Sequence, residues 1–237
     1  MFERGGISPH FAALPACCSW GYSTWGDGVT HTNTARPQTE PSVVQFGPLS
    51  VRRFRAMNTQ IEIRALDLTA GSALGRVEAL FRAIESRLSR FRADSELCAL
   101  NANGMLCASR ELLDVLTLSM TLHADTAGVF DPLILDALEA AGYDRSFEMV
   151  ADRSEAPRAA RPSPRFAAIS IDRDTRVVTL PAGARIDLGG IGKGWAVDRA
   201  GTLLASAGDF QINAGGDQLA RGQCGDGQGW PASIIHP

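Results

Sequence analysis

One stretch decides the fold: Ile186-Asp187-Leu188-Gly189-Gly190-Ile191-Gly192-Lys193-Gly194-Trp195. The apolar residues 184–188 predict a strand, residues 189–194 a glycine-rich loop, and residues 195–207 a helix. Glycines let the phosphate groups of a ligand approach the backbone, and the N-terminus of a helix offers unpaired N–H donors to them. Lys193 adds positive charge at the same place. The stretch therefore predicts a pyrophosphate site, although a tight strand-to-helix turn beside a solvated lysine would use the same residues.

The same stretch matches neither of two common nucleotide-binding motifs. No GxxxxGK[ST] sequence can be drawn through it, and it does not satisfy GxGxxG. The generic nucleotide-binding folds that carry these motifs are therefore disfavoured.

A second glycine cluster, Asn213-Ala214-Gly215-Gly216-Asp217, follows a predicted strand at residues 210–213. Two loops that allow close backbone approach could therefore meet at one edge of a sheet. Asp187 and Asp217 are candidate ligands of Mg²⁺, which prefers oxygen atoms and keeps some of its waters. Either carboxylate could instead cap a helix or a turn.

A third element, Thr126-Ala127-Gly128-Val129-Phe130-Asp131-Pro132, again places a glycine and an aromatic residue at the start of a predicted helix. A loop with a core Phe130 and a capping Asp131 explains this element at least as well. His123 is more typical of a packed or surface histidine than of a catalytic base. No Ser/His/Asp or Cys/His arrangement is evident.

The periodicity of residues 54–141 predicts one strand followed by three helices. Alternating residues indicate a strand at residues 54–66, followed by a helix that starts near Leu74 and ends near Arg90. Ser109 is a candidate N-cap for a second helix. Asp131 and Pro132 open a third helix, because Asp caps well and Pro suits the first helical position.

Hairpins follow in the second half of the chain. Residues 152–164 are charged and contain proline, which is typical of a loop, whereas residues 168–171 and 177–180 flank a turn and predict two paired strands. Residues 230–235 predict a further strand. Because helices and hairpins occur in blocks rather than in strict alternation, the sequence predicts an α+β fold with a mixed or antiparallel sheet and packed helices.

Composition excludes several classes of function. The chain has 237 residues and a formal charge of -3, with basic and acidic residues scattered rather than gathered into blocks, so nucleic-acid binding is not expected. Its five cysteines form no CxxC pair, which argues against a disulfide framework and a zinc site. No apolar stretch approaches the roughly 20 residues that cross a bilayer.

Two regions are expected along the chain. Residues 1–48 are rich in Gly, Pro, Ser and Thr without periodicity and predict a disordered N-terminal extension, and residues 49–237 predict one domain. Residues 14–17 have the spacing of a lipoprotein cleavage box, but no apolar run of roughly 7 to 15 residues precedes them. The chain as written is therefore expected in the cytoplasm, and in the periplasm if its natural N-terminus differs.

Five stretches, in this order, resemble the ApbE family, the FAD:protein FMN transferases. They are residues 56–59 (AMNT), 85–101 (ESRLSRFRADSELCALN), 126–132 (TAGVFDP), 187–199 (DLGGIGKGWAVDR) and 213–217 (NAGGD). The resemblance implies an α+β flavin transferase domain. Its reaction would move FMN from FAD to a Thr or Ser hydroxyl of an acceptor flavoprotein, with the help of Mg²⁺, and AMP would leave.

The resemblance also implies roles for individual residues, position by position. Met57 would touch the adenosine part of FAD, and Phe91 would stand where the family often has an aromatic residue. Three residues would line the flavin nucleotide: Gly128, Val129 and Phe130. Asp187 and Lys193 would hold FAD as well, and the backbone carbonyl of Gly190 would bind Mg²⁺.

Two departures from the family pattern are visible. Family members commonly have Met-Gly-Thr where this chain has Met57-Asn58-Thr59, a change that is tolerable if Asn58 avoids positive φ. The family also continues with a DPxTG-type segment and then an Asp and a Thr or Ser that complete the magnesium site, whereas this chain ends at Pro237. A C-terminally truncated domain is therefore expected. The alternatives to a transferase are a non-catalytic FAD-binding module, an inactive fragment, and an FAD hydrolase that gives FMN and AMP.

Overall fold

The structure is a computed structural model that describes residues 49–66, 70–143, 168–224 and 227–232. The expected extension at residues 1–48 and the expected loop at residues 152–164 lie outside these ranges. Of the predicted strand at residues 230–235, residues 230–232 are described and are not in a strand, and the rest lie outside. None of the helices within the described ranges combines the length and apolarity needed to cross a membrane.

A four-stranded antiparallel sheet is the first part of the fold. Its strands, in spatial order, are β1 (Leu49–Ala56), β2 (Thr59–Leu66), β6 (Phe210–Ala214) and β7 (Asp217–Arg221). Alternate residues of β2 are buried, because successive side chains of a strand point to opposite faces. Ile61 and Ile63 are fully buried, as is their neighbour Ile212 on β6. The sheet thus has one apolar face.

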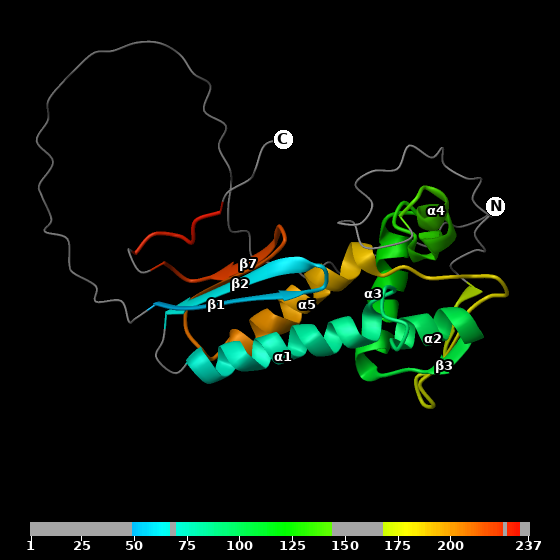
Figure 1. The fold of residues 1–237 in the computed structure, drawn as a ribbon, viewed down its shortest axis with the longest axis horizontal. Coiled ribbons are helices and arrows are strands. Elements are labelled where there is room, and N and C mark those ends of the chain that lie inside the picture. The colour runs from blue at the N-terminus through cyan, green and yellow to red at the C-terminus, as the bar shows by residue number, and fades with distance from the viewer. Residues whose placement is uncertain (1–48, 67–69, 144–167, 225–226, 233–237) are drawn as a thin grey trace, which may run out of the picture. The chain divides into compact units, whose positions relative to one another are not determined.

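Two long helices, α1 (Ala70–Leu88) and α5 (Gly189–Leu204), cover that face and pack against each other (Figure 1). Val77, Phe81 and Ile84 lie on one side of α1 and are fully buried. Gly201, in the last turn of α5, lets the sheet come close, because a β-carbon there would lie 2.2 Å from a methyl group of Leu219 on β7. The core therefore lies between the helix pair and the sheet.

A second group of elements follows α1. It comprises α2 (Glu96–Asn103), β3 (Met105–Cys107), α3 (Arg110–Asp125), the 3₁₀ helix η1 (Pro132–Ile134), α4 (Leu135–Ala140), β4 (Ser170–Ile171) and β5 (Val177–Thr179). The three short strands form a separate antiparallel sheet in the order β3-β5-β4. Ser95, Ser109 and Asp131 cap α2, α3 and η1 through hydrogen bonds to backbone N–H groups.

Much of the predicted architecture is confirmed. The α+β class, the antiparallel pairing, the helix that ends near Arg90, the Ser109 cap and the hairpin formed by β4 and β5 are all present. The helix after Asp131 is present as well, although its first turn is a 3₁₀ helix. Three elements were not predicted, because they are short and carry little periodicity: α2, β3 and β7.

The single strand predicted at residues 54–66 is wrong. The chain reverses at Met57 and Asn58, whose φ angles are 52° and 58°, so that two strands pair where one was expected. Ala56 pairs with Thr59, which leaves a two-residue turn. Both arms alternate with the same period, and no glycine or proline marks the turn, so the pattern gave no signal of a reversal.

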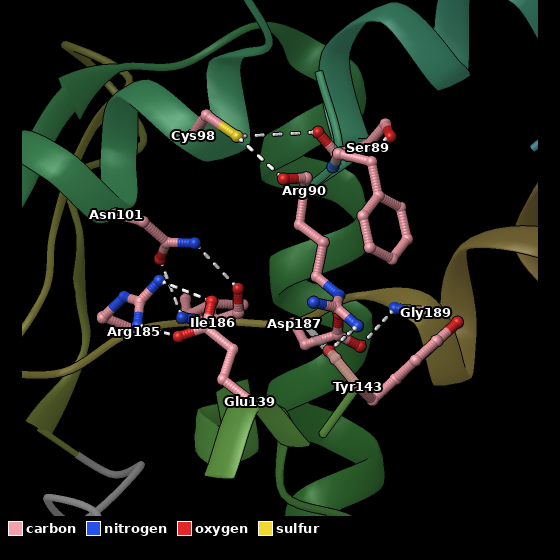
Figure 2. Close-up of polar contacts among 11 residues, drawn as sticks. Ser89, Arg90, Cys98, Asn101, Glu139, Tyr143, Arg185, Ile186, Asp187 and Gly189 are labelled. Atoms are coloured by element: carbon pink, nitrogen blue, oxygen red, sulfur yellow. Dashed lines mark hydrogen bonds and ion pairs between the residues drawn. The ribbon is translucent and has the colours of Figure 1, made fainter. Parts of the chain in front are cut away.

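The strand predicted at residues 184–188 is also wrong. The side chain of Asn101 donates to the carbonyl of Ile186 at 2.9 Å and accepts its N–H at 2.7 Å, so a side chain replaces a neighbouring strand (Figure 2). The N–H of Asp187 donates to the carbonyl of Pro132 at 2.8 Å. The glycines at residues 189–194 are likewise not a loop, because α5 already begins at Gly189.

Candidate functional site

Most of the predicted site residues gather around one cavity of about 820 Å³. It lies where the β1–β2 turn, the end of α1 and the start of α5 meet. Its wall includes five of the eight predicted residues, namely Met57, Phe91, Asp187, Gly190 and Lys193. A volume of this size is typical of small-molecule binding sites, which measure about 300–1,000 Å³.

Asp187 lies at the end of the non-helical segment, residues 184–188, that leads into α5. One carboxylate oxygen, Oδ1, accepts the N–H of Gly189 at 2.8 Å, and the other, Oδ2, lies 2.7 Å from Nε of Arg90. A β-carbon at position 189 would lie 2.9 Å from Oδ1 of Asp187, so this hydrogen bond requires a glycine. Both oxygens of the carboxylate are therefore engaged within the protein.

Arg90 is the partner of Asp187 and was not among the predicted site residues. The two side chains are only 6% and 9% exposed, and Nη2 of Arg90 donates to the carbonyl of Tyr143 at 2.8 Å. The guanidinium carbon lies 4.2 Å from the ring centre of Phe91 and 4.4 Å from that of Tyr143. Figure 2 shows Arg90 directed toward Asp187 and Tyr143. A buried charge with this many partners is well compensated.

The β1–β2 turn forms another part of the wall. Met57 and Asn58 both have left-handed backbone, which costs a residue other than glycine roughly 1–2 kcal/mol. Asn58 was expected to replace glycine only if its φ is not positive, and this expectation is wrong. Asparagine is tolerated here because it enters the left-handed region more readily than most other residues with side chains. The N–H of Met57 donates to Oε1 of Glu85 at 2.8 Å.

Lys193 joins the start of α5 to the β6–β7 turn. Its Nζ lies 3.7 Å from Oδ2 of Asp217, the first residue of β7. The two hairpin turns also touch, because a β-carbon at Gly215 would lie 2.1 Å from the hydroxyl oxygen of Thr59. The Lys193–Asp217 pair brings the two glycine clusters together as expected, although the first cluster is the start of a helix rather than a loop. Asp187 and Asp217 each have a basic partner.

The segment at residues 126–132 reaches the site through one residue. The ring of Phe130 packs on Gly190, where a β-carbon would lie 3.6 Å from Cε2. None of the three predicted residues of this segment, Gly128, Val129 and Phe130, lines the cavity itself. Val129 is 90% exposed. His123 lies 2.8 Å from the carbonyl of Phe130 through Nδ1, which identifies it as a packed histidine that braces this segment.

The charge of the cavity wall is mainly positive. Four basic side chains line it, from Arg55, Arg90, Arg92 and Lys193, against the two acidic side chains of Glu85 and Asp187. Arg92 also lies 2.9 Å from Asp94 outside the wall and, by hydrogen bonding, lowers the pKa of that carboxyl. The excess of basic groups, together with the N-terminus of a 16-residue helix, suits a dianionic pyrophosphate.

The described residues do not fit a magnesium ion by themselves. Among them, no group of three or more His, Cys, Asp or Glu side chains could hold a metal. Asp187 uses both oxygens on Arg90 and Gly189, and Gly190 lies in the first turn of α5. Mg²⁺ needs several oxygen ligands in near-octahedral geometry, which this set does not supply.

A second cavity, of about 1020 Å³, lies on the other side of α4 and contains no predicted site residue. In its wall Arg185 bonds Glu139 at 2.6 and 2.9 Å and Asp136 at 2.8 Å (Figure 2). The Glu139 carboxylate, with Asp136, raises the pKa of the Arg185 guanidinium against the effect of burial. This arrangement is a closed ion-pair network with no surplus of positive charge for a phosphate.

Comparison with known proteins identifies the family of this chain. The model of the ApbE family matches residues 57–237. The chain belongs to the ApbE family. Among curated proteins it is 22% identical over 200 residues to the FAD:protein FMN transferase of Haemophilus influenzae.

Solved ApbE structures share the fold. The apo flavinyl transferase ApbE of Pseudomonas stutzeri superposes with a TM-score of 0.69 at 22% identity, covering 80% of this chain and 66% of that one. The flavin transferase ApbE of Vibrio cholerae superposes with a TM-score of 0.65 at 20% identity, covering 79% and 63%. The match to the Haemophilus influenzae relative covers 77% of this chain, and the chain spans only 57% of that relative's length.

Proposed function

We propose that this ApbE-family chain binds FAD in the 820 Å³ cavity and serves transfer of FMN from FAD to a Thr or Ser hydroxyl of an acceptor flavoprotein, with AMP as the second product. Membership of the family and the named activity of its curated relative support this proposal. The cavity supports it independently, since it combines basic residues, aromatic residues and a helix start.

One observation carries the proposal: the start of α5 is a prepared anion site that opens into the cavity. Asp187 holds Gly189 in place through Oδ1, and Gly190 and Gly192 leave the backbone without side chains at the wall. Lys193 stands at the same helix start. The positive end of the helix dipole and the lysine would face the two phosphates of FAD.

The reaction that we propose is a substitution at phosphorus. The acceptor hydroxyl oxygen forms a bond to the phosphorus of the FMN half, and the bond from that phosphorus to the bridging oxygen breaks. AMP leaves with the bridging oxygen, and the hydroxyl proton goes to solvent or to a base. Such a transfer depends mainly on positioning and on neutralising phosphate charge, which Lys193 and the positive end of the α5 dipole can supply.

The aromatic and apolar residues of the wall suit the rings of FAD. Phe91 is 39% exposed and Ile134 41%, although both are large and apolar, and both line the cavity. A flat ring system placed on Phe91 would cover this surface. Met57, at the opposite hairpin, would contact the adenosine half as the family resemblance implies.

The magnesium dependence that the resemblance implies remains part of the proposal in a restricted form. The family resemblance implies that the Gly190 carbonyl binds the ion, and the described ranges contain no cluster of three or more acidic, His or Cys side chains to join it, so we propose that further anionic ligands come from outside these ranges. We therefore assign no step of the reaction to the metal.

Labelling of an acceptor tests the proposal. The chain is incubated with FAD, Mg²⁺ and a Thr-containing acceptor domain from a flavinylated redox subunit, and a denaturing gel is inspected for covalent flavin fluorescence. We expect labelled acceptor with wild-type chain and none with EDTA or with Lys193→Ala. Free FMN and AMP without labelled acceptor would instead identify an FAD hydrolase, and FAD retention without either product a binding module.

A further inference from the structure

The β1–β2 turn that forms one wall of the cavity is strained, and a side chain from another element holds it. We propose that Glu85 is a positioning residue of the site: its carboxylate fixes the backbone of Met57 and so keeps the Met57 side chain against α5. The inference rests on the proposed function for the identity of the ligand, and on the geometry of this turn for everything else.

The strain is visible in two consecutive residues. Met57 and Asn58 have φ angles of 52° and 58°, the left-handed pair of a two-residue type I′ hairpin turn. Such turns normally use Asn-Gly or Gly-Gly, which enter this region easily. Methionine has no polar group with which to compensate the strain within its own residue. Something outside the turn therefore has to favour this conformation.

Glu85 supplies that outside contact. It lies on α1, 28 residues along the chain, and its Oε1 accepts the N–H of Met57 at 2.8 Å. A hydrogen bond from a backbone N–H to a carboxylate is charge-assisted and is stronger than a bond between neutral groups. Because the acceptor belongs to α1, the position of the turn depends on the helix as well as on its own two strands.

The strained conformation places the Met57 side chain at the site. A β-carbon at Gly192 would lie 3.4 Å from Cε of Met57, so the methionine packs on the bare backbone of α5 between Gly190 and Lys193. Glu85 and Met57 both line the cavity. Strained backbone that persists beside a binding cavity is a mark of a site held ready for its ligand. A glycine at position 57 would relieve the strain and lose this side chain.

Three variants test the inference. Glu85→Ala removes the acceptor, Glu85→Gln keeps an acceptor oxygen without the charge, and Glu78→Ala is the matched control. Glu78 is an acid on the same helix that pairs with Arg52 and Arg82 and does not line the cavity. Each variant is titrated with FAD by fluorescence quenching, and its thermal midpoint is measured.

We expect Glu85→Ala to weaken FAD binding about tenfold, which matches the loss of one hydrogen bond to a charged group. Glu85→Gln should stay within about threefold of wild type, because the amide oxygen still accepts the Met57 N–H. Glu78→Ala should change the midpoint only and leave FAD affinity unchanged. Equal FAD affinity in wild type, Glu85→Ala and Glu78→Ala would overturn the inference.

A ligand-free readout separates this inference from the proposed function. Hydrogen exchange of the Met57 amide is followed by NMR in the same variants, and we expect faster exchange in Glu85→Ala than in Glu85→Gln or Glu78→Ala. If wild type fails to bind FAD, the proposed function falls while the exchange rates still decide whether Glu85 holds the turn. Unchanged Met57 exchange in Glu85→Ala would contradict the positioning role.

Discussion

Nε of Arg90 lies 2.7 Å from Oδ2 of Asp187, and this buried ion pair connects the end of α1 with the start of α5. The other oxygen of the same carboxylate receives the first N–H of α5, from Gly189. The helix start that we propose as the pyrophosphate site therefore depends on an arginine that lies 97 positions before Asp187 in the chain. Asp187 acts here by orienting Gly189 rather than by offering a free charge.

Arg90→Met should both destabilise the fold and weaken FAD binding. Removing one partner of a buried ion pair leaves the other charge uncompensated and costs about 3–5 kcal/mol. Urea unfolding and FAD titration measure the two effects. Arg82→Ala is the control, because its pair with Glu78 is exposed and contributes about 1 kcal/mol or less. Equal losses of stability in the two variants would contradict the central place of Arg90.

Gly189→Ala should weaken FAD binding, whereas Gly194→Ala on the same helix should not. A β-carbon at position 189 would lie 2.9 Å from an oxygen of Asp187, which Arg90 prevents from moving away. A β-carbon at Gly194 meets nothing within 4 Å, and alanine there should stabilise the helix by about 0.5–1 kcal/mol. The same FAD dissociation constant for both variants would contradict the claim that FAD binding requires a glycine at position 189.

Asn58→Gly should raise the thermal midpoint by a few degrees, and Asn58→Val should lower it. The φ of Asn58 is 58°, a value that glycine adopts freely and that a β-branched residue resists. The exposed Asn58 side chain gives up only a 3.4 Å bond from Arg55. Differential scanning calorimetry of the three proteins decides the order. A midpoint that falls with glycine would show that the asparagine side chain matters more than the backbone.

Asn101→Leu should destabilise the segment that leads into α5. Its side-chain amide makes two hydrogen bonds to the backbone of Ile186, and a buried N–H and C=O would lose their partners. Leaving such groups unsatisfied costs about 1–3 kcal/mol each. Chemical unfolding gives the loss of stability, and hydrogen exchange at the Ile186 amide locates it. Wild-type protection of the Ile186 amide in the variant would contradict a stabilising role for the Asn101 side chain.

Much of the fold could be predicted from the sequence, because the buried faces of α1 and α3 and the capping residue Ser109 are local signals. The prediction was wrong where a long-range contact replaces a local pattern. At Ile186 a side chain from α2 takes the place of a strand, and at Met57 a carboxylate from α1 supports a turn without glycine. Neither partner can be read from the residues that it supports.

The candidate site divides in the same way. Asp187 and Lys193 could be predicted because a carboxylate, glycines and a lysine adjoin one another in the sequence. Arg90 and Glu85 could not, although both lie in the stretch at residues 85–101 that resembles the family, because charged side chains usually face solvent. Only the long-range contacts of Arg90 with Asp187 and of Glu85 with Met57 show that these two residues line the cavity.

A crystal structure of the chain with FAD tests the central claim most directly. Our account predicts that the diphosphate lies against the first turn of α5, within hydrogen-bond distance of Lys193, with a ring system on Phe91. A diphosphate bound in the second cavity beside Arg185, or anywhere away from α5, would contradict it.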